Sequence, residues 1–202
     1  MPSPPKKVDL SFLNGPLPKK IMKDPVWACK KLFGIKPWER QAEIIRAPFT
    51  HRRTEVHTGH AVGKTCSLCM IPVLWLLSKY PSYVIITSSD WTSLRGVIFS
   101  GMRHYLRQSN IMGDFYEPLV DEWSPAGRSH KWGVIGISPD KVERAQGKHG
   151  EAGTLLIIDE YSFMEYTIST PLMANLTSSR DVALVVGNPL RASGPFADAT
   201  RS

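Results

Sequence analysis

The stretch His57-Thr58-Gly59-His60-Ala61-Val62-Gly63-Lys64-Thr65 is the strongest indication of architecture in this chain, because it ends in Gly63-Lys64-Thr65 and runs directly into an apolar segment. A phosphate-binding loop enters its helix in this way. Backbone N–H groups and the positive helix end surround an anion, a lysine reaches the β and γ phosphates, and a hydroxyl binds Mg²⁺. The strict pattern has glycine where this chain has Thr58, with Gly59 one place later. A glycine turn before an ordinary helix therefore stays open from this stretch alone.

A second segment, Leu155-Leu156-Ile157-Ile158-Asp159-Glu160, supplies the acidic strand end that such a loop requires. Its four apolar residues predict a buried strand, so Asp159 should lie at the carboxyl edge of a sheet and hold Mg²⁺. Glu160 follows where the chain turns, and its carboxylate can polarise an attacking water. An acidic pair is also common as a helix cap. Combined with Gly63-Lys64-Thr65, it predicts a nucleotide hydrolase that uses ATP and Mg²⁺.

The apolar pattern predicts an α/β fold around these two motifs. Strands are expected at 53–57, 83–87, 154–159 and 181–186, and helices at 25–33, from 36 onward, at 63–80, 91–108 and 163–176. Strands that alternate with helices, with the phosphate loop after the first strand, are typical of a P-loop NTPase of the ASCE type. This fold is a three-layer sandwich with a mainly parallel sheet. Residues 54–57 are polar for a central strand of such a sheet, which normally reads as a continuous apolar run.

Length and composition indicate one folded domain with a short extension. The chain has 202 residues, of which 42% are hydrophobic. Residues 1–25, rich in proline and lysine, predict an extended basic arm, and residues 26–202 predict the P-loop ATPase domain. Within it, 113–150 is expected to be an irregular insertion or hairpin, with 131–137 as its best strand.

Charge and cysteine content narrow the function classes. The net charge of +7 favours a polyanionic partner such as DNA or RNA. Three cysteines predict no disulfide framework and no zinc site. No stretch approaches the length of a membrane span, and the N-terminus lacks the apolar segment of a signal peptide, so a cytosolic protein is expected.

Two further features are candidates for nucleotide contact. Gln41 lies on the helix upstream of the phosphate loop, and its amide carries the donor and acceptor needed to read an adenine edge. An arginine commonly completes the charge neutralisation of a triphosphate. Arg144, Arg180 and Arg191 are the candidates, and the sequence does not rank them.

Taken together, the order of these motifs resembles the ATPase domain of the large terminase subunit of tailed bacteriophages. The resemblance extends from about residue 36 to residue 196. It rests on Trp38 to Gln41, Gly59 to Thr65, Leu156 to Glu160, Val186-Gly187-Asn188-Pro189 and Leu190-Arg191-Ala192-Ser193-Gly194.

The resemblance implies a role for each part of the site. The implied catalytic residues are Glu160 and Lys64, and the metal-binding residues are Thr65 and Asp159. The implied nucleotide-binding residues are Gln41, Gly59, His60, Ala61, Val62, Gly63, Lys64 and Thr65. Gly187, Asn188 and Pro189 would couple hydrolysis to movement. The family's loop often has an arginine or a second glycine where this chain has His60 and Ala61.

The resemblance also implies partners and a location. It implies a Mg²⁺-dependent ATPase that drives double-stranded DNA into a procapsid, as a ring on a portal protein and together with a small terminase subunit. The isolated chain would be a monomer. Its place would be the cytoplasm of the infected bacterial host, transiently on the procapsid portal. Large terminase subunits carry a C-terminal nuclease domain as well, for which this sequence has no residues.

Three other interpretations stay open from the sequence. A helicase-like nucleic-acid translocase shares the glutamine, the loop and the acidic pair, but should continue into a second motor domain. A small P-loop kinase fits the length, but usually needs a lid with clustered arginines. An inactive nucleotide- or DNA-binding remnant would explain the polar first strand.

Overall fold

The structure, a computed structural model, describes residues 11–59, 63–109, 116–118, 122–125, 132–191 and 193–199. The helical segments are η1 (Ser11–Asn14), α1 (Leu17–Lys23), α2 (Pro25–Phe33), α3 (Glu39–Thr50), α4 (Lys64–Ser78), α5 (Trp91–Ser93), η2 (Leu94–Phe99), α6 (Ser100–Gln108), η3 (Pro139–Ala145), η4 (Tyr161–Phe163), α7 (Tyr166–Ala174) and α8 (Pro195–Ala199). The strands are β1 (Arg53–His57), β2 (Tyr83–Ser88), β3 (Tyr116–Pro118), β4 (Glu122–Pro125), β5 (Gly133–Ile137), β6 (Thr154–Asp159) and β7 (Val182–Gly187).

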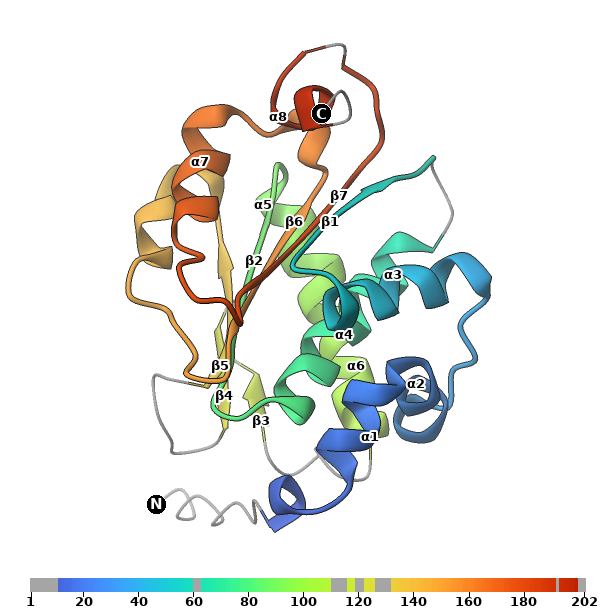
Figure 1. Cartoon of the computed structure of the whole chain (residues 1–202). Helices are drawn as coiled ribbons and strands as arrows, with labels where there is room; N and C mark the ends of the chain where they lie inside the picture. Colours follow the sequence, from blue (N-terminus) through green and yellow to red (C-terminus); the bar gives the residue numbers. More distant parts are fainter. Residues whose placement is uncertain are drawn as a thin grey trace, which may run out of the picture.

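The described strands form one sheet in the order β1-β7-β6-β2-β5-β4-β3 (Figure 1). Strands β1, β7, β6, β2 and β5 pair in parallel, and β4 and β3 continue the sheet antiparallel. Strand β7 thus lies between the strand that precedes the phosphate loop and the strand that ends in the acidic pair. The α/β fold with a mainly parallel sheet is confirmed.

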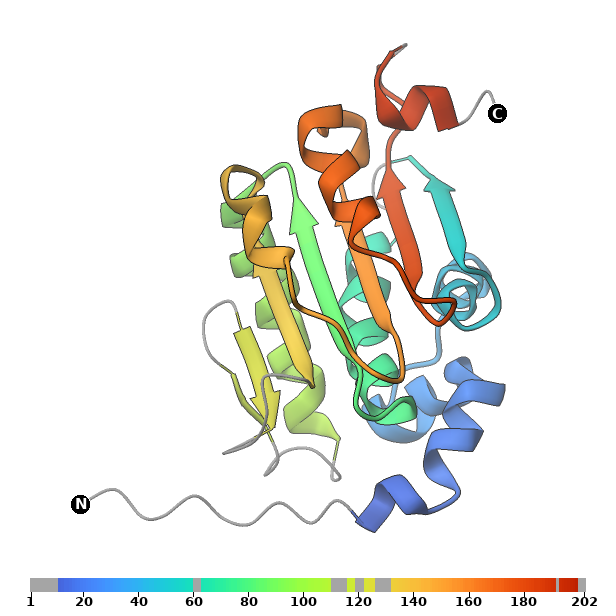
Figure 2. The ribbon, with the colours of Figure 1, turned by 60° about the vertical axis from the view of Figure 1, so that its left-hand side comes forward.

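Side chains that alternate along the central strands feed two separate cores. On β2, Val84 and Ile86 join the core with α4, whereas Tyr83 and Ile85 join the core with α7 and η3. The same alternation holds on β6, because neighbouring residues of a strand point to opposite faces. Figures 1 and 2 show helices on both faces of the sheet, the larger layer on the side of α3, α4 and α6. This is the expected three-layer sandwich.

The polarity of residues 54–57 has a simple structural reason. Strand β1 lies at the end of the described sheet order and pairs only with β7. Its residues are exposed or half-buried, whereas those of β7 are all buried. On this edge Arg53 and Glu55 form an ion pair of 3.0 Å. The apolar run expected of a central parallel strand is therefore not required here.

The expectation of an extended arm over residues 1–25 is wrong for residues 11–25. These residues form η1, α1 and the start of α2, and Ile21 on α1 is completely buried in the core that surrounds α4. Proline supports this order locally, because the Pro16-Leu17-Pro18 segment begins α1 and Pro25 begins α2. Residues 1–10 lie outside the described residues.

Part of the region 113–150 belongs to the main sheet. Strand β5 pairs in parallel with β2 and antiparallel with β4, and all five of its residues are buried. The expected strand at 131–137 is present as Gly133–Ile137, but it is a fifth parallel strand. Residue 131 and most of 110–131 lie outside the described residues.

Most expected helices are present, and one has an unexpected geometry. Helix α2 covers Pro25–Phe33 and ends at Gly34, whose φ of 67° is the left-handed geometry of a helix end. The helix expected at 91–108 is divided into α5, the π-helical segment η2 and α6. Over the residues that the structure describes, no helix has both the length and the apolar content of a membrane span.

We expect Ile21→Ala to lower the free energy of unfolding by about 2–4 kcal/mol, because the substitution leaves a cavity between α1 and the main core. Met22→Ala on the same helix is the control, since Met22 is exposed. It should change the free energy by about 0.5 kcal/mol or less. Urea unfolding of both variants measures the difference. Equal, small effects would show that α1 does not contribute to the folded core.

Candidate nucleotide site

The carboxyl edge of the parallel strands brings the two sequence motifs together. A cavity of about 310 Å³ lies there. Its lining includes Lys64 and Thr65 at the start of α4, Asp159 and Glu160 at the end of β6, and Asn188 just after β7. The remaining lining residues are Ser93, Val97, Ile98, Phe163 and Leu190. Five predicted site residues from three chain segments therefore share one cavity.

The phosphate loop meets its helix at Gly63. This residue has a φ of 75°, which favours glycine, and a Cβ there would lie 2.4 Å from Nε2 of Gln41. The Gln41 amide donates to the carbonyl oxygen of Gly63 (3.3 Å) and accepts from the Trp38 N–H (3.3 Å). Gln41 thus connects α3 to the loop exit. His60, Ala61 and Val62 lie outside the described residues.

Lys64 is held by the segment after β7. Its Nζ donates to Oδ1 of Asn188 over 2.6 Å, a contact between residues 124 positions apart. The start of the loop is attached to the same strand, because the Thr58 N–H donates to the carbonyl oxygen of Gly187 (3.1 Å). The predicted phosphate-binding and coupling residues are therefore in direct contact.

Gly187 has no room for a side chain. A Cβ at this position would lie 3.1 Å from Phe196 and 3.1 Å from Oγ of Ser162. Phe196 of α8 stacks on His57 with 4.2 Å between ring centroids, and Ser162 donates to the carbonyl oxygen of Asn188. The end of β7 is thus packed between η4 and α8, so Asn188 leaves the sheet in a constrained direction.

Asp159 is placed to act as a metal ligand. Burial raises the pKa of its carboxyl group, and the neighbouring charge of Lys64 opposes this effect. Its Oδ1 accepts the N–H of Glu160 over 2.9 Å. A carboxylate that has lost much of its water gains more from a nearby cation than an exposed one does.

Glu160 stands in a strained backbone conformation. Its φ of 53° is the left-handed region, which a non-glycine residue enters at a cost. Its Oε2 accepts a hydrogen bond of 2.5 Å from Oγ of Ser89, which follows β2. Strands β2 and β6 are neighbours in the sheet, so this contact follows from their pairing. The strain turns the Glu160 side chain toward the cavity that Asp159 also lines.

Ser89 is a site residue that sequence reasoning missed. Its position just after the strand at 83–87 indicates only a part of a helix cap. Asp90 makes that cap by accepting the Thr92 N–H (2.9 Å), which leaves Ser89 for Glu160. The π-helical segment η2 has no clear signal in the sequence either, although it supplies Val97 and Ile98 to the cavity. Such segments are frequent at functional sites.

The structure separates the three candidate arginines. Arg191 lies over the ring of Phe163, 5.0 Å from its centroid, and Phe163 lines the cavity. Arg180 precedes β7, at the opposite end of the sheet, and donates to the carbonyl oxygen of Glu151 (3.1 Å). Arg144 lies on η3 and does not line the cavity. Of these three, Arg191 alone is close to the predicted chemistry within one chain.

The donor set fits a magnesium-bound phosphate group. It combines an ammonium, a hydroxyl and two carboxylates around one cavity, and Mg²⁺ in phosphate sites is held by one or two carboxylates plus phosphate oxygens. The buried hydroxyl of Thr58, at the loop entrance, has no hydrogen-bond partner among the described residues. An anion bound in the loop would be within the reach expected of such a donor.

Comparison with solved structures shows which proteins share this fold. The ATPase domain of the large terminase of Thermus phage P74-26 superposes with a TM-score of 0.64 at 19% identity, over 79% of this chain and 68% of that domain. The HK97 bacteriophage large terminase gives 0.62 at 13% identity, over 89% and 41%. The large terminase of another thermophilic bacteriophage gives 0.61 at 13% identity, over 80% and 41%.

The chain therefore spans about two fifths of the length of the latter two terminases. In sequence it matches no protein-family model and no curated protein. The likeness lies in the arrangement of helices and strands, which agrees with the ASCE-type strand order described above. The chain has the P-loop α/β fold of the ATPase domains of bacteriophage large terminases.

Proposed function

We propose that this chain is the ATP-hydrolysing motor domain of a bacteriophage large terminase, which drives double-stranded DNA into a procapsid. The observation that carries the proposal is the single cavity lined by Lys64, Thr65, Asp159, Glu160 and Asn188, on a fold shared with large terminase ATPase domains. The proposed reaction is the hydrolysis of ATP to ADP and phosphate. The proposed setting is a ring on the portal in the bacterial cytoplasm, with the small terminase subunit as a further partner.

The residues divide the chemistry between charge neutralisation and water activation. Lys64 and the N–H groups at the start of α4 bind the phosphates, and Thr65 and Asp159 would hold Mg²⁺. When bound, Mg²⁺ neutralises the charge that develops on the phosphate oxygens. Glu160 orients the attacking water and accepts its proton, and Ser89 fixes the Glu160 carboxylate by the 2.5 Å hydrogen bond. Arg191 is the proposed source of the additional positive charge.

Asn188 is proposed to couple hydrolysis to movement. Its hydrogen bond to Lys64 competes with phosphate, because one ammonium group has to serve both partners. Binding of the γ-phosphate would draw Lys64 away and release the segment Gly187-Asn188-Pro189. Release of phosphate would restore the hydrogen bond. The coupling free energy then comes from the exchange of partners at Lys64.

A second cavity offers room for the base and sugar of ATP. Its volume is about 640 Å³, and it lies between α3 and β1 with Thr58 and Gly59 in its lining. We assign adenosine to this cavity because the phosphate loop begins there. Gln41 already uses its donor and acceptor on backbone groups, so an adenine contact by Gln41 requires the exchange of one of these bonds.

We expect Lys64→Ala to lower the rate of ATP hydrolysis at least ~100-fold, because a preorganised charge on the phosphates is removed. Lys141→Ala, an exposed lysine on η3, is the control and should retain the parent rate. Phosphate release is measured at several protein concentrations, with and without linear double-stranded DNA, at two salt concentrations. Stimulation by DNA that fades with salt is expected. A Lys64→Ala rate within about threefold of the parent contradicts the proposal.

For Asp159→Asn we expect abolished hydrolysis together with a higher melting temperature in the absence of Mg²⁺. Burial raises the pKa of Asp159 in the folded state, so its charged form costs stability once the pH exceeds the unfolded-state pKa. Asparagine removes this cost. The difference in melting temperature should be present at about pH 8 and vanish near pH 4, where the aspartate is protonated in the folded state. A variant that melts below the parent at both pH values excludes this account of Asp159.

Glu160→Gln should abolish turnover but keep nucleotide affinity, because water activation matters more to the reaction than to binding. Ser89→Ala should lower kcat roughly tenfold at unchanged KM, as expected when a hydrogen bond to a charged group is removed. Ser100→Ala, an exposed serine on α6, is the matched control. Steady-state kinetics and equilibrium nucleotide binding separate the two effects. If Ser89→Ala changes KM alone, Ser89 does not position the base.

A further inference from the structure

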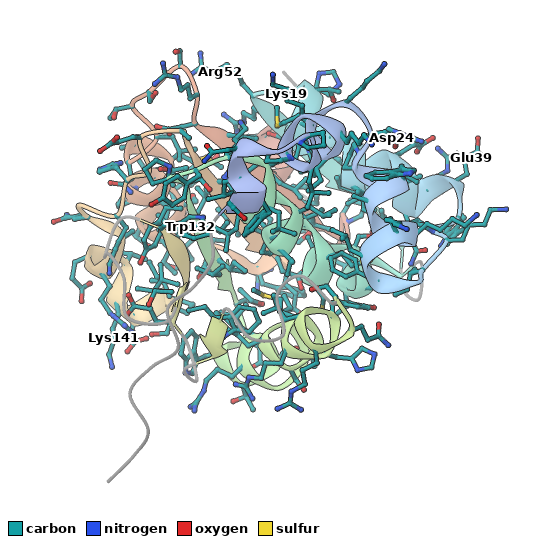
Figure 3. All side chains as sticks on the ribbon, turned by 90° about the horizontal axis from the view of Figure 1, so that it is seen from below. Lys19, Asp24, Glu39, Arg52, Trp132 and Lys141 are labelled. Atoms are coloured by element: carbon teal, nitrogen blue, oxygen red, sulfur yellow. The ribbon has the colours of Figure 1, made fainter. Side chains whose placement is uncertain are left out.

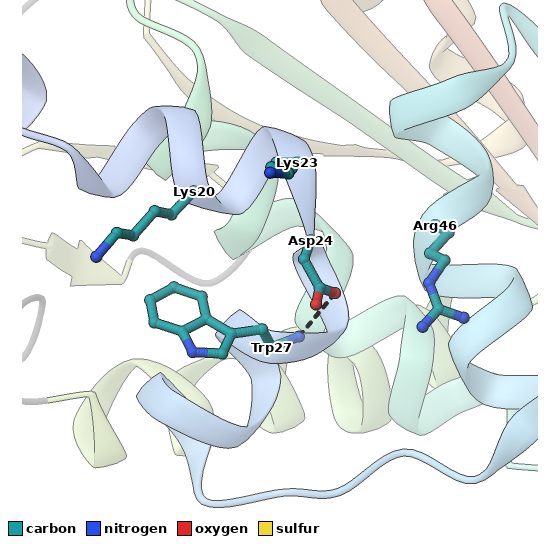
Figure 4. A pocket seen from close by; sticks show the side chains of 5 residues that line it. All are labelled: Lys20, Lys23, Asp24, Trp27 and Arg46. Atoms are coloured by element: carbon teal, nitrogen blue, oxygen red, sulfur yellow. Dashed lines mark hydrogen bonds between the residues drawn. The ribbon is translucent and has the colours of Figure 1, made fainter.

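A basic cavity lies on helices α1, α2 and α3, away from the carboxyl edge of the sheet. In Figures 1 and 2 the parallel strands point toward α8, and α1 lies at the other end of the molecule. The cavity has a volume of about 550 Å³. Figure 4 shows its lining residues, Lys20, Lys23, Asp24, Trp27 and Arg46. The proposed nucleotide site uses none of them.

The three cations of this cavity are available to an external anion. Among the residues that the structure describes, no carboxylate forms an ion pair with Lys20, Lys23 or Arg46. Asp24 is engaged elsewhere, because its Oδ1 accepts the Trp27 N–H over 3.0 Å and caps α2 (Figure 4). The lining therefore combines three positive charges with one carboxylate that already serves the backbone.

Trp27 gives the cavity an aromatic surface. Its side chain is 37% exposed, and Nζ of Lys20 lies 5.7 Å from the ring centroid. A large exposed aromatic ring costs solvation free energy unless a partner covers it. Aromatic rings beside cations are how proteins hold single-stranded nucleic acid, because bases stack on the ring while lysine and arginine contact the phosphates.

The positive charge of the chain is concentrated around this cavity. Residues 11–50 contain eight lysines and arginines but three acids, an excess of five out of the net +7 of the whole chain. Figure 3 views the molecule from this end, with α1 toward the viewer. Lysines 19, 20, 23, 30, 31 and 36 are all exposed. Such a one-sided charge distribution matches a polyanion.

We propose that this cavity binds a strand of nucleic acid, with Lys20, Lys23 and Arg46 on consecutive phosphates and Trp27 stacked on an unpaired base. An acidic protein segment would satisfy the cations but would leave the indole ring without a stacking partner. The proposal depends on the proposed function only for the choice of DNA over RNA.

The position of the cavity connects it mechanically to the nucleotide site. Helix α1 packs against α4, whose first residue is Lys64. Helix α4 has 15 residues and so spans about 22 Å. A strand held on α1 and α2 would therefore respond to shifts of α4 that begin at the phosphates.

The test measures binding of a fluorescent single strand of about a dozen nucleotides over a salt series, without ATP. For Lys20→Ala/Lys23→Ala the slope of log K against log salt should fall in magnitude by about 1.4, because each phosphate that no longer has a lysine partner accounts for about 0.7. Arg107→Ala/Lys141→Ala removes two exposed charges elsewhere and should leave the slope unchanged. Trp27→Leu should weaken binding about fivefold or more at unchanged slope.

Competitors identify the ligand chemistry. Unlabelled single strand should displace the probe, whereas blunt duplex, inorganic phosphate and polyglutamate at equal charge concentration should displace it poorly. Equal slopes for the Lys20/Lys23 and control variants would overturn the proposal. So would unchanged affinity of Trp27→Leu, or displacement by polyglutamate as effective as that by the single strand. Because no nucleotide is present, a chain that fails to hydrolyse ATP still gives a clear result here.

Discussion

Parallel pairing of β1, β7 and β6 is the constraint on which the proposed site depends. The phosphate loop leaves β1 and the acidic pair ends β6, yet these two strands do not touch, because β7 lies between them. All three carboxyl ends therefore meet at one edge, with Asn188 between the two motifs. The 2.6 Å hydrogen bond from Lys64 to Asn188 exists only because of this order. A sheet with β1 beside β6 would leave the segment after β7 outside the site.

The same edge concentrates features that cost stability. Asp159 is buried enough for its pKa to rise, Glu160 adopts a left-handed backbone conformation, and Gly187 leaves no room for a Cβ. Such costs persist only where the surrounding structure enforces them. Here β2 and β7, on either side of β6, supply the partners: Ser89 holds the carboxylate of Glu160, and packing by Ser162 and Phe196 fixes the end of β7. The sheet core supplies rigidity at the point where chemistry is proposed.

Two ends of the molecule carry different charge properties. The carboxyl edge combines Lys64 with two carboxylates, which suits a phosphate with a divalent cation. The helices α1 to α3 carry most of the excess positive charge without a comparable number of acids. Helix α4 connects the two ends, because it begins at the phosphate loop and packs against α1. This separation would allow a polyanion to bind without competing for the nucleotide site.

Local patterns alone predicted the strands β2, β6 and β7, the helices α2 and α4, and the meeting of Gly63-Lys64-Thr65 with Asp159-Glu160. Continuous apolar runs and a glycine after a helix act within a few residues, so they can be read without the fold. The tertiary structure alone decided the rest. Strand β1 is polar because it lies at the sheet edge, and α1 is ordered because Ile21 is buried against a distant helix. Ser89 reaches Glu160 because β2 pairs with β6. Each of these depends on which segments become neighbours across long stretches of chain, and no local periodicity encodes that choice.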